Sequence, residues 1–317
     1  MIIILNQKIN LAVSNILKLI GSPDSGKIFI YTSQGKYNFA KFIYDNLNKH
    51  GFQKGRLFFL NNVLNQDSIK KFKEQLVEIS RDNGILFFVE PKYQKNYFDI
   101  FGRPDFGQKL KLKHFFSDLF FPVDNLIRIY GIDLTKLITF KQNLQSELSG
   151  ASVIETTTNS GTEITIHPRS WQSTEVGEIY TAPIEYIAEG KIVIDGCAYF
   201  GPPKENFTLE LKKGQVININ SLNTNDEQQK MVIGDLTRDE NANILAELGI
   251  GLNPAALWYE ELMEAECARG TCHFGFGNNI EYGGSNKSSY HFDLVVKNPT
   301  IIVDGQKICK AGKYFFG

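Results

Sequence analysis

The chain has few cysteines, no excess of charge and no long apolar run, and each absence excludes a class of protein. Four cysteines in 317 residues are too few and too scattered for a disulfide framework, so we expect reduced thiols. Lys and Arg number 34 against 35 Asp and Glu, which gives no electrostatic reason to bind nucleic acid or a membrane surface. No apolar run approaches the roughly 18 residues of a membrane-spanning helix, and the start lacks the features of a signal peptide. These patterns predict a cytoplasmic protein with small-molecule partners.

The length, composition and hydrophobic pattern of the chain predict two folded domains. A length of 317 residues exceeds one ordinary core, and contents of 42% hydrophobic and 22% charged residues are typical of globular proteins. Up to about residue 150, apolar strand-like runs alternate with amphipathic helical stretches, the pattern of an α/β domain with a largely parallel sheet. The expected strands cover 27–33, 56–62 and 85–90, and the expected helices cover 39–51 and 67–84.

The pattern changes towards the middle of the chain. The run LIRIYGI (126–132) is strand-like, and a polar amphipathic helix follows it and ends near Gly150. From residue 151 onward, short strands alternate with turns, including a hairpin pattern in LKKGQVI (211–217) and one helix from about Asn223 to Gly234. We therefore expect an N-terminal α/β domain over 1–150 and a β-rich α+β catalytic domain over 151–317.

His291 and Asp293 form the clearest chemical pattern. They stand two positions apart on a strand-like run, so both side chains leave the same face of the strand. Burying them in an otherwise apolar strand is costly unless they hold each other or a cation. On these two residues alone, a metal site and a satisfied polar pair remain equally open.

Three further residues are candidate ligands. His273 precedes the glycine-rich turn FGFGNN and lies 18 residues before His291. Glu247 and Glu178 are single acids in the apolar segments NILAELGIGLNP and VGEIYTAP, which suggests burial and therefore a need for a partner. Taken singly, each glutamate is also compatible with an ordinary surface position.

Together these segments resemble the aminopeptidase T family of metallopeptidases, which includes the staphylococcal aminopeptidase S. The resemblance covers nearly the whole C-terminal half in the same order. It runs through SGTEITI (160–166), GEIYTAP (177–183), GKIVIDG (190–196), LAELGIGLNP (245–254), GTCHFGFGNNIEYGG (270–284), NKSSYHFDLVV (286–296) and IIVDGQKI (301–308).

The resemblance implies a homodimeric aminopeptidase with two divalent ions, zinc, cobalt or manganese, and a peptide or small amide substrate. The implied ligands are Glu178, Glu247, His273, His291 and Asp293. A water activated by two metals would attack the scissile carbonyl, with Glu247 as the first candidate for the proton shuttle. The family also uses a tyrosine seven residues after the first histidine. Here that position is Ile280, and Tyr282 is the candidate catalytic tyrosine two positions later.

A second class of enzyme shares the fold of this family. A ring-cleaving dihydroxypyridine dioxygenase uses one Fe(II), and His273, His291 and Asp293 alone would form the two-histidine, one-carboxylate set of such enzymes. The presence of both Glu178 and Glu247 favours the two-metal hydrolase over this alternative. A metallo-amidohydrolase dedicated to one metabolite is a third hypothesis, and a binding protein without activity is the least supported.

Overall fold

The structure, a computed structural model, describes residues 2–20, 28–32, 37–49, 51, 56–59, 70, 74, 85–89, 114–116 and 123–316. It combines helices and sheets with a β-rich C-terminal region, and the expected fold class is confirmed in these terms. The chain separates into two compact units, Met1–Ile132 and Asp133–Gly317. The expected boundary near 150 was drawn at the end of a helix that the structure groups with the second unit. None of the described helices is both long enough and apolar enough to span a membrane.

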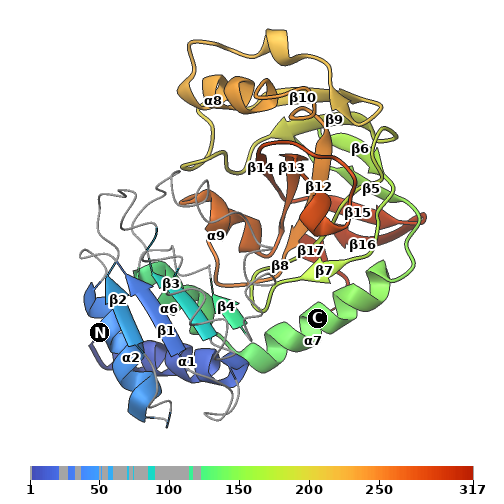
Figure 1. The fold of residues 1–317 in the computed structure, drawn as a ribbon. Coiled ribbons are helices and arrows are strands. Elements are labelled where there is room, and N and C mark those ends of the chain that lie inside the picture. Colours follow the sequence, from blue (N-terminus) through green and yellow to red (C-terminus); the bar gives the residue numbers. More distant parts are fainter. Residues whose placement is uncertain are drawn as a thin grey trace. The chain divides into compact units, whose positions relative to one another are not determined.

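The first unit contains a four-stranded sheet with the order β2-β1-β3-β4, in which all neighbouring strands run parallel (Figure 1). The expected helix over 67–84 lies almost entirely outside the described residues. Within this range the structure describes Lys70 and Glu74, and both are helical. The elements of this unit are α1 (Ile2–Ile20), β1 (Ile28–Thr32), α2 (Tyr37–Lys49), β2 (Arg56–Phe59), β3 (Ile85–Val89), β4 (His114–Phe116) and α6 (Val123–Tyr130).

The strand predicted over 126–132 is wrong, because these residues form most of helix α6 and the turn after it. Short apolar runs fit a buried helix as well as a strand, so their periodicity does not distinguish the two. Helix α6 contacts α1 in the structure. The side chain of Asn15 on α1 donates hydrogen bonds to the carbonyl oxygens of Tyr130 and Ile132, each 2.8 Å long. Ile129 and Tyr130 are buried as a result.

The second unit begins with the predicted amphipathic helix, α7 (Leu134–Leu148). The Asp133 side chain caps it by accepting hydrogen bonds from the first-turn amides of Thr135 and Lys136. The apolar face of α7 is buried, and Phe140 meets the ring of Tyr314 edge-on at 5.1 Å. The C-terminal segment is thereby fixed against this helix.

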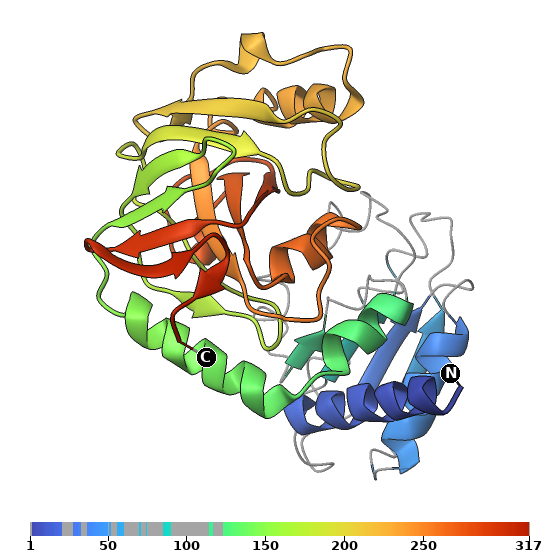
Figure 2. The same cartoon turned by 180° about the vertical axis from the view of Figure 1, so that it is seen from behind.

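Two antiparallel sheets make up most of the second unit (Figures 1 and 2). Their orders are β11-β10-β9-β6-β5-β15-β16-β17 and β14-β13-β12-β8-β7. The predicted hairpin turns at Lys213 and Gly214, both with positive φ. The strands are β5 (Ile154–Thr157), β6 (Glu163–Ile166), β7 (Gln172–Ser173), β8 (Glu178–Thr181), β9 (Glu189–Ile194), β10 (Phe207–Lys212), β11 (Gln215–Val216), β12 (Leu245–Gly251), β13 (Thr271–Gly277), β14 (His291–Lys297), β15 (Thr300–Val303), β16 (Gln306–Lys310) and β17 (Lys313–Tyr314). The helices are η4 (Ile219–Ser221), α8 (Glu227–Leu236), α9 (Leu262–Cys267) and η5 (Ile280–Tyr282).

The five-stranded sheet has one apolar and one polar face. Its β12 and β13 are buried along their whole length. Leu248, Phe274 and Leu294 point to the apolar face and are fully buried in the core. Strand alternation therefore sends their chain neighbours to the opposite face. That opposite face carries the candidate site.

Candidate metal centre

Strand register brings the predicted ligands to one face of the five-stranded sheet. The central strands carry glycines on this face, and the ligands stand opposite them on neighbouring strands. The facing pairs are Glu247 with Gly275, Gly249 with His273, Gly275 with Asp293, Gly277 with His291, and Gly251 with Glu178. Residues far apart in the sequence are thus neighbours on the sheet.

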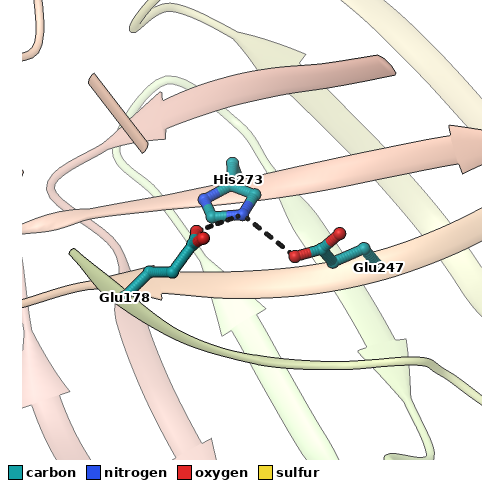
Figure 3. Close-up of side chains that lie close together, drawn as sticks. All are labelled: Glu178, Glu247 and His273. Carbon is teal, nitrogen blue, oxygen red and sulfur yellow. Dashed lines mark hydrogen bonds and ion pairs between the residues drawn. The ribbon is translucent and has the colours of Figure 1, made fainter. Parts of the chain in front are cut away.

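His273 lies between two carboxylates (Figure 3). Its Nε2 atom is 3.1 Å from Oε2 of Glu178 and 3.4 Å from Oε1 of Glu247. Ligand atoms of these three residues lie within 4.8 Å of one another. This spacing is compatible with a shared cation.

His291 repeats this arrangement on the other side of Glu247. Its Nε2 atom is 3.1 Å from Oε2 of Glu247 and 3.0 Å from Oδ1 of Asp293. Its Nδ1 atom lies 2.7 Å from the carbonyl oxygen of Asn278, which fixes the ring with Nε2 towards the carboxylates. All five predicted ligands therefore converge, with Glu247 shared between the two imidazoles.

Two glycines on the central strands make this convergence sterically feasible. A Cβ atom at Gly249 would lie 2.0 Å from Nε2 of His273. A Cβ atom at Gly275 would lie 2.6 Å from Oδ1 of Asp293 and 2.6 Å from Cε1 of His291. The imidazoles occupy the volume that side chains would otherwise fill. The predicted turn FGFGNN (274–279) is wrong in its first four residues, which form the end of β13 and leave one face of that strand open at alternate glycines.

Gly275→Ala is therefore expected to displace Asp293 and His291 and to reduce metal binding, while the apolar face of the sheet remains packed. Equilibrium metal titration of the purified variant measures the effect. Gly234→Ala is the matched control, because a Cβ atom at Gly234 meets nothing within 4 Å. Wild-type metal affinity in the Gly275 variant would show that the two ligands do not need this space.

The interior of the cluster is closed to solvent and its outer carboxylates are not. The side chains of His273, His291 and Glu247 are 1%, 4% and 5% exposed, whereas those of Glu178 and Asp293 are 17% and 18% exposed. Among these five side chains, Glu178 and Asp293 are therefore the most exposed to solvent.

The electrostatics of the cluster reflect close pairing of buried charges. Burial lowers the pKa of His291, but Asp293 and Glu247 outweigh this effect and raise it to about 10. Burial likewise opposes protonation of His273, and hydrogen bonds with Glu178 and Glu247 raise its pKa well above the ordinary value. Burial also raises the pKa of Glu178, and the hydrogen bond with His273 opposes that rise.

Helix α9 adds a carboxylate that the sequence analysis did not name. The helix packs on β12, β13 and β14, and its Ala265 joins Val295 in a buried apolar cluster. Burial and the charge of Asp293 raise the pKa of Glu266 well above its ordinary value. In the sequence, Glu266 looks like one of several acids on a short amphipathic helix, so only the packing of α9 reveals it.

The donor set fits a divalent transition metal. The Nε2 atom of each imidazole lies between two carboxylate oxygens, from Glu178 and Glu247 around His273 and from Glu247 and Asp293 around His291. Among the described residues, no group donates to or accepts from the buried Nδ1 atom of His273. A bound cation stabilises carboxylates that are buried close together. Imidazole and carboxylate donors suit iron, zinc, cobalt and manganese alike.

Tyr282 lies beside the ligands. Its ring centroid is 4.8 Å from that of His291 and 5.5 Å from that of Tyr180. The prediction that Tyr282 belongs to the site is thus compatible with its position, while its role is a separate question.

Comparison with known proteins points to one family in particular. A protein-family model described as NicX, 2,5-dihydroxypyridine 5,6-dioxygenase, matches residues 143–315, more than half of the chain. The 2,5-dihydroxypyridine 5,6-dioxygenase of Pseudomonas putida is 28% identical over 161 residues, a match that covers 46% of this chain and 45% of that protein. The aligned part is therefore less than half of that relative's length.

Solved structures share the fold over the whole chain. The structure of 2,5-dihydroxypyridine dioxygenase from Pseudomonas putida KT2440 has a TM-score of 0.71 at 16% identity and covers 96% of this chain and 95% of its own. Wild-type AmpT from Thermus thermophilus has a TM-score of 0.68 at 11% identity and covers 98% and 99%. At these identities the likeness concerns the fold alone.

The prediction of a metallo-aminopeptidase, and with it the assignment as a hydrolase or protease, is wrong. The family model and the curated relative both describe a dioxygenase. The error came from taking Glu178 and Glu247 as evidence for two metals. Each glutamate contacts the Nε2 atom of an imidazole, and such contacts do not by themselves set the number of metal ions.

Proposed function

Because the chain belongs to the 2,5-dihydroxypyridine 5,6-dioxygenase family, we propose that it is an Fe(II)-dependent dioxygenase that opens a dihydroxylated pyridine ring. The observation that carries the proposal is the convergence of His273, His291 and Asp293 inside the matched region. Two histidines and one carboxylate are the donor set of many non-haem Fe(II) oxygenases. A bound Fe(II) would supply the reducing centre needed to activate dioxygen.

The remaining carboxylates have separate roles in this proposal. Glu247 has one carboxylate oxygen 3.4 Å from Nε2 of His273 and the other 3.1 Å from Nε2 of His291, so it would stand beside a metal ion held by both imidazoles. Opening of a hydroxylated ring requires a hydroxyl proton to leave, and its acceptor must lie on the accessible side. The side chain of Glu178 is 17% exposed, and its Oε2 atom lies 3.1 Å from Nε2 of His273. We assign Glu178 as that acceptor.

The experiment is oxygen uptake by the purified protein with 2,5-dihydroxypyridine as substrate. We expect uptake, together with loss of the ring absorbance, after loading with Fe(II) under anaerobic conditions. Removal of the metal with a chelator should abolish both signals, and Fe(II) should restore them better than zinc. Equal restoration by zinc would contradict an iron-dependent oxygenase, because zinc has no redox chemistry.

A further inference from the structure

Three aromatic rings form a row along one side of the metal centre. Tyr180 lies two positions after Glu178 on β8, on the same face, and its backbone pairs with that of Gly249. The Tyr282 ring meets Tyr180 edge-on, with an interplanar angle of 84°, and meets His291 at a tilt of 54°. His291 is buried, whereas both tyrosines are partly exposed. The row therefore leads from a ligand of the metal centre to the surface.

The segment that carries Tyr282, residues 278–286 between β13 and β14, is held by buried amides. We call it the Tyr282 loop. The Asn286 amide nitrogen donates to Oδ1 of Asn279 at 2.8 Å, and its side chain donates to the carbonyl oxygen of Gly277 at 2.6 Å. Asn279 and Asn286 are 0% and 4% exposed. Both ends of the loop are thereby fixed to each other.

Glu185, which lies between β8 and β9, binds the Tyr282 loop through its side chain. Its Oε1 atom accepts hydrogen bonds from the Asn279 side chain at 2.9 Å and the Ser285 amide at 2.7 Å, and its Oε2 atom pairs with Arg169. Burial would raise the pKa of Glu185, but these hydrogen bonds outweigh it and lower the pKa to about 2. The carboxylate is therefore ionised at neutral pH, and its hydrogen bonds to the loop are of the stronger, charge-assisted kind.

We propose that Tyr282 is the surface against which the substrate ring packs beside the metal centre, and that Glu185 is the positioning residue that holds it there. The proposal rests on the proposed function for the identity of the ring. Aromatic rings favour tilted or offset contacts with one another at centroid distances of roughly 4.5–7 Å. A flat pyridine ring on Tyr282 would stay next to His291 and Asp293, with its hydroxyl groups towards the carboxylates. Tyr282 thus selects planar aromatic substrates and takes no part in proton transfer.

Four variants test this assignment: Tyr282→Leu, Tyr282→Phe, Glu185→Gln and the double variant Tyr282→Leu with Glu185→Gln. Phe315→Leu is the control for loss of an aromatic side chain, since Phe315 is 64% exposed and follows β17 of the other sheet. The measurements are iron content, calorimetric binding of 2,5-dihydroxypyridine without oxygen, and KM and kcat for oxygen uptake.

Tyr282→Leu is expected to weaken ring binding and raise KM about tenfold, the size of one lost aromatic contact, with iron content and kcat unchanged. Tyr282→Phe should behave like the wild type, because the ring remains. Glu185→Gln should raise KM in the same direction at unchanged iron content. The double variant should be little worse than Tyr282→Leu, since both changes remove one interaction.

The outcomes separate this proposal from the proposed function. Turnover by the wild type with unchanged KM in Tyr282→Leu would overturn the role of Tyr282 and leave the dioxygenase assignment intact. Loss of kcat in Tyr282→Phe would instead make Tyr282 a proton-transfer residue and contradict the packing role. Ring binding that depends on Tyr282 in a protein without oxygen uptake would support the packing surface and reject the dioxygenase. Absence of ring binding to the wild type would reject both.

Discussion

A variant with His291 replaced by alanine is expected to lose bound iron and oxygen-dependent ring cleavage together. The Nε2 atom of His291 lies 3.0 Å from Asp293 and 3.1 Å from Glu247, so it is the nitrogen donor of one candidate ligand group. Loss of residues that merely orient ligands costs roughly 10–100-fold in metal affinity. Loss of a ligand should cost more. Elemental analysis after Fe(II) loading and desalting measures the effect.

His167→Ala is the matched control for this variant. The His167 Nδ1 atom contacts the carbonyl oxygen of Ser152 at 2.9 Å, outside the site. The His167→Ala variant should therefore retain both bound iron and activity. Wild-type iron content in His291→Ala, with activity also retained, would show that the cluster of charged residues is not the metal centre.

Glu247→Gln is expected to have the second-largest effect. Glutamine keeps the size of the side chain and one acceptor oxygen, but removes the negative charge that both imidazoles face. We expect iron affinity to fall roughly 10–100-fold, with activity partly restored by excess Fe(II). Iron titration followed by oxygen uptake at saturating iron separates these two effects.

Glu155→Gln, on the exposed side of β5 in the other sheet, is the control for loss of one glutamate. A Glu247→Gln variant with full iron affinity and normal turnover would make Glu247 a structural acid. The orientation of the two histidines would then have to depend on Asn278 and the strand backbones alone.

The five candidate ligands could be predicted because each leaves a local signal. His291 and Asp293 stand two apart on a strand, and His273, Glu247 and Glu178 interrupt apolar or glycine-rich segments. Strand periodicity then places them on one face. Periodicity does not determine the register between strands. The pairing of Gly249 with His273 on neighbouring strands therefore comes from the structure alone.

Other parts of the site depend on contacts between distant segments. Glu266 interacts electrostatically with Asp293 through the packing of α9 on β14, and Glu185 holds the Tyr282 loop across about 100 positions of sequence. The strand expected over 126–132 failed for a related reason, since a short apolar run fits a strand as well as the helix α6, which contacts α1 through Asn15. The choice between hydrolase and dioxygenase failed because carboxylate number alone does not distinguish a ligand from a residue that orients one.

The central claim, that this protein is a dioxygenase, is tested most directly by the fate of molecular oxygen. The Fe(II)-loaded protein is supplied with 2,5-dihydroxypyridine under dioxygen labelled with the heavy isotope, and the product is analysed by mass spectrometry. The account predicts a ring-opened product that carries both labelled oxygen atoms. A product without label, or oxygen taken only from water, would contradict it.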